Sequence, residues 1–297
     1  MIVKLDSNTP FCLDYSLNCG QVFRWTKLGQ RWRGIVESSV IDIAQKEKNL
    51  ILNSYPCPKD DSFVKKYFRL DDDLSKILVQ IKKDAMIAVA IDELHGLRLI
   101  RQDPWECLIS FICATYANIP RIKQMIAHLA QKFGNKIHTQ EEVFYSFPTQ
   151  ESLAKATIHE LRECGLGFRA KYIFEATQKI VNGFDLQELS TIPYEKAKTR
   201  LTSLPGVGSK VADCVLLFSL DKLEAFPVDV WIARIISTHY LQQQDSFVYA
   251  TKHRQISDFG KKYFGKYAGY AQEYLYHYYK QHITETDRAR RKKQRNV

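Results

Sequence analysis

Leu204-Pro205-Gly206-Val207-Gly208-Ser209-Lys210 lies between two apolar segments with helical periods, and the chain continues into Val211-Ala212-Asp213-Cys214. Two glycines separated by one residue allow a tight turn and a close approach of the backbone to another molecule. The amide groups at the start of the second helix can then face a phosphate. The stretch therefore predicts a hairpin between two helices that binds a DNA backbone through Gly206, Val207 and Gly208. An ordinary helix turn is the competing interpretation, because Pro-Gly connections are common.

Strand signals precede this hairpin and are confined to the beginning of the chain. Short runs rich in β-branched and aromatic residues occupy positions 22–25, 32–36, 40–44 and 50–53, separated by turn residues. They predict a small, mostly antiparallel sheet. From about residue 74 the apolar positions follow helical periods, and we find no strand signal after residue 100. The expected fold class is α+β, with a small antiparallel sheet followed by a mainly helical body.

Helix boundaries are marked by capping residues. Asp103-Pro104 predicts the start of a helix through Phe111, and Pro120 that of a helix closing at Gly134. Thr157 and Glu160 have the spacing of a capping box. A further helix is expected over 168–181, ending at Asn182-Gly183, and another from Pro193 into the hairpin.

The chain length of 297 residues favours more than one domain. We expect an N-terminal antiparallel-sheet domain over residues 1–97 and helical domains over 98–285, with the helix-hairpin-helix at about 193–219. Six of the last ten residues are basic. We expect 286–297 to form a disordered basic tail, since such charge runs are usually solvated extensions.

Charge and cysteine content indicate which kinds of partner and bound group to expect. Lys and Arg number 43 against 33 Asp and Glu, a net charge of +10 that favours a polyanion. The seven cysteines are odd in number and contain no CxxC pair, so we expect neither disulfides nor a metal site, and no cofactor. No stretch resembles a membrane span or a secretory signal. The expected location is the cytoplasm or nucleoid, or the nucleus in a eukaryote.

A second motif is Phe226-Pro227-Val228-Asp229-Val230-Trp231-Ile232, whose Asp229 lies nineteen residues after Lys210. Asp229 can cap a helix there and present its carboxylate inward. Here the sequence resembles the helix-hairpin-helix DNA glycosylase superfamily, and specifically the 8-oxoguanine DNA glycosylases. The resemblance covers nearly the whole chain, through the blocks Cys19-Gly20-Gln21-Val22-Phe23-Arg24-Trp25, Phe111-Ile112-Cys113, Asn118-Ile119-Pro120-Arg121-Ile122, Gly165-Leu166-Gly167-Phe168-Arg169-Ala170 and Ala268-Gly269-Tyr270-Ala271-Gln272.

The resemblance implies a catalytic pair. Lys210 would attack C1′ of the flipped nucleotide as an amine, form a Schiff base with the opened sugar, and promote β-elimination. A Lys at this position distinguishes the enzymes of the superfamily that also cut the strand from those that only activate water. Asp229 would stabilise the cationic sugar while also capping its helix.

The resemblance also implies a base pocket and a set of DNA contacts. The carbonyl of Gly20 would accept a hydrogen bond from N7–H, which 8-oxoguanine has and guanine lacks. Gln272 would read the Watson–Crick edge, with Cys214 and Tyr276 on the two ring faces. Phe168 would fill the gap left by the flipped base, and Arg169 and Arg121 would read the orphan cytosine. Judged without the resemblance, Arg121 and Arg169 are ordinary helix charges, and Phe168 is a core residue.

Two positions depart from the family pattern. Tyr116, near Asn118, stands where an Asn contacts the orphan cytosine, which puts strict selection for cytosine in doubt. Trp231 stands in place of a phosphate-contacting His, and it offers one N–H donor without a charge.

We therefore predict a bifunctional glycosylase and lyase that acts as a monomer on double-stranded DNA containing 8-oxoguanine. A non-catalytic DNA-binding module is an alternative of another class, although backbone binding requires neither Lys210 nor Asp229. A glycosylase for a different damaged base is the alternative among enzymes.

Overall fold

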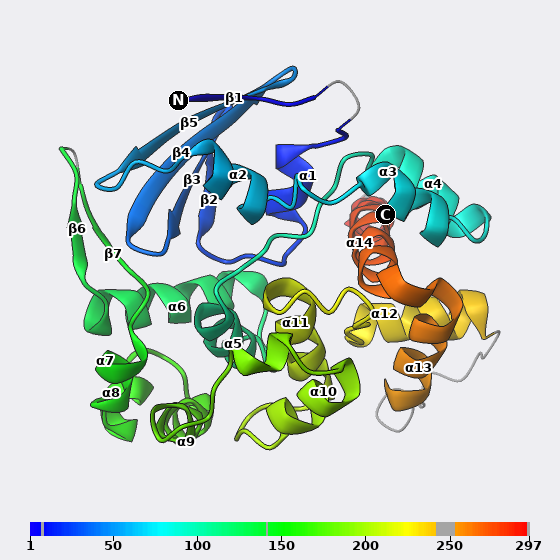
Figure 1. Cartoon of the computed structure of the whole chain (residues 1–297). Coiled ribbons are helices and arrows are strands. Elements are labelled where there is room, and N and C mark those ends of the chain that lie inside the picture. Colours follow the sequence, from blue (N-terminus) through cyan, green and yellow to red (C-terminus); the bar gives the residue numbers. More distant parts are fainter. Residues whose placement is uncertain (7–8, 141, 242–252, 296–297) are drawn as a thin grey trace.

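The computed structural model describes residues 1–6, 9–140, 142–241 and 253–295, with side chains up to residue 282. It places an antiparallel sheet on one side of a body of helices (Figure 1). This arrangement confirms the α+β class expected from the sequence.

The sheet contains β1 (Ile2–Lys4), β2 (Trp25–Leu28), β3 (Arg31–Val36), β4 (Ser39–Lys46) and β5 (Asn49–Tyr55) in the order β1-β5-β4-β3-β2. All neighbouring strands pair antiparallel. Leu50 and Leu52 of β5 are buried, whereas Ile51 between them is exposed, because successive side chains of a strand point to opposite faces. The three predicted strands at 32–36, 40–44 and 50–53 are confirmed.

Other strand predictions need correction. The first predicted run, 22–25, forms a strand only from Trp25 onward, because Val22 and Phe23 pack into two different cores. β1 was not predicted. The expectation of no strand after residue 100 is wrong, since β6 (Lys136–His138) and β7 (Val143–Tyr145) form a hairpin. Three-residue strands are too short to show a period of two.

Helices dominate the rest of the described chain. α1 (Leu13–Asn18) and α2 (Asp61–Tyr67) accompany the sheet, and α3 (Leu74–Ile81) and α4 (Ala85–Glu93) follow. The body contains α5 (Pro104–Cys113), α6 (Ile119–Phe133), α7 (Gln150–Ala154), α8 (Ile158–Glu163), α9 (Arg169–Val181), η1 (Glu188–Ser190), α10 (Tyr194–Thr202), α11 (Ser209–Ser219), α12 (Val230–Ile235), η2 (Ile236–Tyr240), α13 (His253–Phe264), η4 (Gly265–Tyr267) and α14 (Ala268–Arg295).

The capping residues act as the sequence predicts. The Asp103 side chain accepts a hydrogen bond from the amide of Glu106 at the start of α5. Thr157 and Glu160 form the complete capping box of α8. Helix α6 runs from Ile119 to Phe133, and the predicted Gly134 is its C-cap.

The buried apolar side chains form two hydrophobic cores, one against the sheet and one in the helical body. The sheet core includes Trp25, Ile43 and Leu52, and the helical core contains the apolar side chains of α5, α9, α11 and α14. Leu74, Ile77 and the other buried residues of α3 and α4 belong to the helical core. The boundary predicted at residue 97 therefore does not coincide with the division between the cores.

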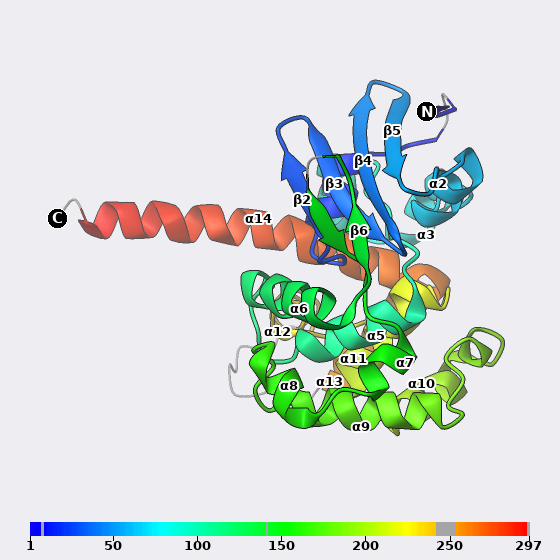
Figure 2. The same cartoon turned by 90° about the vertical axis from the view of Figure 1, so that its left-hand side faces the viewer.

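Helix α14 begins inside the helical body and extends far beyond it (Figure 2). The predicted disordered tail differs from the structure, in which residues 286–295 continue this helix. Arg, Lys, Gln and Ala have high helix propensity, and a charge run of this composition can propagate an existing helix. Residues 296–297 lie outside the described residues.

Candidate functional site

The predicted hairpin connects α10 to α11. Gly206 has φ +78°, a conformation that favours glycine, and a Cβ there would lie 2.6 Å from Cβ of Tyr172. Gly208 is extended, and a Cβ on it would meet nothing within 4 Å. The fold thus requires a glycine at Gly206, whereas at Gly208 the missing side chain leaves the backbone open to another molecule. Val207, between the two glycines, is buried.

The N-terminus of α11 has no side-chain cap. Its first amides are therefore available to a ligand, and the helix dipole there favours an anion. This geometry fits the predicted contact with a DNA phosphate.

Lys210 lies in the first turn of α11. Its Nζ is 5.1 Å from the ring centroid of Phe111, a contact typical of a cation on an aromatic face. Cys214 follows one turn later and is buried, which raises the pKa of its thiol to about 12. Cys214 therefore stays a neutral thiol near pH 7 and presents an uncharged surface beside the amine.

Asp229 is the N-cap of α12, as predicted. Its Oδ1 accepts hydrogen bonds from the amides of Trp231 and Ile232, at 3.0 and 2.8 Å. Burial raises the pKa of its carboxyl, and those amides together with the charges of Lys210 and Lys280 oppose the rise. In the folded chain Lys210 and Asp229 are therefore close enough for their charges to interact.

Helix α14 contributes side chains that interact with these groups. Tyr276 lies beside Gly20, where a Cβ would be 3.8 Å from the Tyr276 hydroxyl. Gly20 has φ +102°, so the turn itself requires a glycine. Lys280 donates a hydrogen bond to the Tyr276 hydroxyl at 3.1 Å. Gln272 is only 5% exposed, and within the described residues its Oε1 has no hydrogen-bond partner.

An aromatic and cationic surface lies beyond the hairpin. Phe168 is 53% exposed and contacts Tyr172 edge to face at 6.1 Å between centroids. The guanidinium of Arg169 lies 4.5 Å from the Phe168 ring centroid and donates to the carbonyl of Thr115. Arg121 donates to the carbonyl of Gly165 at 2.7 Å. Phe168 and both arginines therefore come together around the loop before α6.

That loop carries the two remaining predicted contacts. Tyr116 is 94% exposed and has φ +51°, a left-handed conformation that Asn adopts more readily than Tyr. The Asn118 side chain caps α6 by accepting a hydrogen bond from the amide of Arg121.

Trp231 lies in the first turn of α12 and is half-buried. The guanidinium carbon of Arg234 lies 5.3 Å from the centroid of the Trp231 ring.

Four residues at the site were missed by sequence reasoning. Phe111 and Tyr172 look like core and surface aromatics in the sequence. Glu273 and Lys280 look like ordinary helix charges. The signal available was helical spacing, because Glu273, Tyr276 and Lys280 lie three and four residues apart and therefore share a face of α14.

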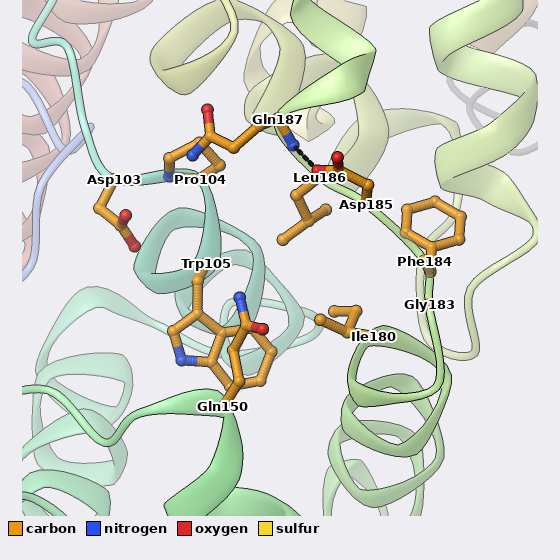
Figure 3. Close-up of a pocket in the computed structure, with 10 residues that line it drawn as sticks. All are labelled: Asp103, Pro104, Trp105, Gln150, Ile180, Gly183, Phe184, Asp185, Leu186 and Gln187. Carbon is orange, nitrogen blue, oxygen red and sulfur yellow. Dashed lines mark hydrogen bonds between the residues drawn. The ribbon is translucent and has the colours of Figure 1, made fainter.

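A separate surface pocket of about 290 Å³ lies where the start of α5 faces the end of α9 (Figure 3). Its two carboxylates, Asp103 and Asp185, accept hydrogen bonds from backbone amides of their own turns. None of the predicted site residues lines it. Within the described residues, no cluster of His, Cys, Asp or Glu could hold a metal ion, and no helix is long and apolar enough to cross a membrane.

Comparisons with known proteins agree with this geometry. The family model for the N-terminal domain of 8-oxoguanine DNA glycosylase matches residues 3–108 of this sequence. The family model for HhH-GPD superfamily base excision DNA repair proteins matches residues 109–266. An N-glycosylase/DNA lyase of Saccharomyces cerevisiae is 38% identical over 79% of this chain and 69% of its own length. An N-glycosylase/DNA lyase of Arabidopsis thaliana is 30% identical over 91% of this chain and 78% of its own length.

Solved structures show the same likeness. The 8-oxoguanine glycosylase/lyase of Clostridium acetobutylicum, in complex with double-stranded DNA containing cytosine opposite 8-oxoguanine, superposes with a TM-score of 0.86. It is 30% identical, and the match covers 95% of this chain and 98% of that one. Both family models and these relatives show that the chain belongs to the 8-oxoguanine DNA glycosylases of the HhH-GPD superfamily.

Proposed function

We propose that this protein excises 8-oxoguanine from double-stranded DNA and cleaves the resulting abasic site by β-elimination. The observation that carries this function is the electrostatic interaction of the Asp229 carboxylate with the Lys210 amine, which lies in the first turn of the uncapped helix α11. DNA-backbone binding alone requires neither group. The N-glycosylase/DNA lyase relatives support the pairing of base release with strand cleavage.

The two catalytic roles follow from charge and geometry. Lys210 supplies the nitrogen that attacks C1′, and it then carries the sugar as a Schiff base. Asp229 is fixed by two amide hydrogen bonds, so its charge is in place before the sugar becomes cationic. Its cap and its catalytic role are compatible, since only Oδ1 accepts from the amides.

The base pocket is formed by Gly20, Cys214, Gln272 and Tyr276. The unpaired Oε1 of Gln272 suits the N–H donors on the Watson–Crick edge of an oxidised guanine. The Gly20 carbonyl is the N7–H acceptor, and the neutral Cys214 and the Tyr276 ring contact the two faces of the base. A buried acceptor that lacks a partner is costly, so a base with matching donors gains affinity there.

The DNA contacts follow from the exposed surface around the hairpin. Phe168 is the wedge, and Arg121, Arg169, Asn118 and Tyr116 surround the orphan base. Gly206, Val207 and Gly208 of the hairpin, with Trp231, contact the DNA backbone. The enzyme works where DNA is kept, in the cytoplasm or nucleoid or in a nucleus.

Borohydride trapping tests the function directly. The protein is incubated with duplexes that contain 8-oxoguanine or guanine opposite cytosine, and sodium borohydride then reduces any Schiff base to a stable covalent complex. We expect a covalent complex and a strand nick with the lesion duplex only. A panel with other damaged bases separates the alternative lesions, and a protein that binds every duplex without trapping would be a non-catalytic module.

A further inference from the structure

Glu273 is a buried carboxyl group of the site with one oxygen that lacks a hydrogen-bond partner among the described residues. Its side chain is 3% exposed, and within the described part of the chain its Oε1 has no hydrogen-bond partner. Burying a carboxylate without partners costs several kcal/mol, at the order of magnitude of such transfers. A buried polar atom of this kind requires an explanation, and none of the roles assigned above uses it.

Glu273 is buried beside Cys19 and interacts electrostatically with the catalytic groups. It hydrogen-bonds with the thiol of Cys19, the residue before Gly20. The other charged or titratable groups that interact with it come from three helices: Lys210 and Cys214 of α11, Asp229 of α12, and Tyr276 and Lys280 of α14. The carboxyl group is therefore in electrostatic contact with both members of the catalytic pair.

The proposed reaction needs a proton acceptor. Lys210 can attack C1′ only after its ammonium loses a proton, because a protonated amine has no free electron pair. Burial raises the pKa of Asp229, but two amide hydrogen bonds stabilise its charged form, and its charge is needed beside the cationic sugar. Glu273 receives no hydrogen bond at Oε1, so its proton affinity is less reduced.

We propose that Glu273 is a positioning residue that accepts the proton from Lys210 and so makes its amine nucleophilic. This inference rests on the proposed function. In the step, an N–H bond of the Lys210 ammonium breaks, its electron pair stays on nitrogen, and an O–H bond forms on Glu273. The protonated carboxyl then holds a proton that can return to the site when the base leaves.

The acidity of the group fits this role. Burial raises the pKa of the Glu273 carboxyl to about 7. The Cys19 hydrogen bond and the charges of Lys280 and Lys210 lower this pKa and so limit the rise. A general base is most effective when its pKa lies near the working pH, because it is then ionised and still basic. Near neutral pH a substantial fraction of Glu273 is then ionised and can take up a proton.

The test compares wild type with Glu273→Gln, which keeps the size of the side chain but cannot ionise. Single-turnover rates are measured from pH 6 to 10 on an 8-oxoguanine duplex and on a duplex with a preformed abasic site. The second substrate needs the Lys210 amine but no base reading, so it separates proton transfer from damage to the pocket. We expect a loss of about 100-fold at pH 7.5 on both substrates, shrinking to a few fold near pH 10, where hydroxide from the solvent can accept the proton in place of Glu273.

Two variants complete the test. Glu273→Asp keeps a carboxyl group and should retain the pH profile of wild type. Glu93→Gln removes a carboxylate that also contacts α14, at His282, but lies outside the site, and should leave the rates unchanged. A loss in Glu273→Gln that is equal at every pH, or no loss, overturns the inference. If wild type fails to trap lesion DNA, the proposed function itself is wrong.

Discussion

Replacement of Glu273 by Gln should make the protein more stable at alkaline pH, whatever it does to activity. The folded chain binds the Glu273 proton more tightly than the unfolded chain does, because burial raises the pKa of this carboxyl from 4.5 to about 7. Its contribution to stability is therefore full below pH 4.5 and is lost as the pH rises through about 7. A Gln side chain is neutral throughout and undergoes no such loss.

The size of the effect follows from the two pKa values. The difference between 4.5 and about 7 corresponds to about 3 kcal/mol in the free energy of unfolding once the group is fully ionised. Part of this change has occurred by pH 5. Between pH 5 and pH 9 the variant should therefore gain about 2 to 3 kcal/mol relative to wild type.

Urea unfolding followed by tryptophan fluorescence measures this difference. Free energies of unfolding are extrapolated to water at pH 5, 7 and 9 for wild type, Glu273→Gln and the control Glu93→Gln. Glu93 is substantially exposed, and an exposed pair such as the one it forms with His282 is worth at most about 1 kcal/mol, so this control should diverge much less from wild type. If the free energies of wild type and Glu273→Gln stay parallel over this pH range, the carboxyl does not titrate near neutrality, and the reasoning about its burial is wrong.

Three further predictions concern the proposed catalytic and DNA contacts. Lys210→Gln should keep the fold and bind lesion DNA but lose base release and nicking, because an amide is not a nucleophile; covalent trapping by this variant would identify another amine. Asp229→Asn keeps the helix-capping oxygen, so thermal unfolding should change little, while single-turnover base release falls by about 100-fold or more; equal rates would remove Asp229 from the catalytic groups. Tyr116→Asn should raise the preference for cytosine over adenine opposite the lesion by about 10 to 100-fold, since each base-reading contact is worth about 1–3 kcal/mol; an unchanged ratio in excision assays would show that Tyr116 does not contact the orphan base.

The sequence predicted features that depend on neighbouring residues. A cap such as Asp103 and the start of α11 after Gly208 involve contacts within about four residues, and these leave a readable pattern. Strands β3, β4 and β5 were found for the same reason, because each is long enough to show its composition. β6 and β7 are too short, and their pairing is a contact between segments that the sequence does not display.

The resemblance supplied the candidate site residues, but it could not show their surroundings. It named Gln272 and Tyr276, whereas the structure added Glu273 between them, buried against Cys19 from the other end of the chain. Helical spacing shows that Glu273, Tyr276 and Lys280 share a face of α14. It does not show which element covers that face, and burial depends on that covering element. The pKa of Glu273 is set by the water excluded when α1, α11, α12 and α14 come together, so only the tertiary structure decided it.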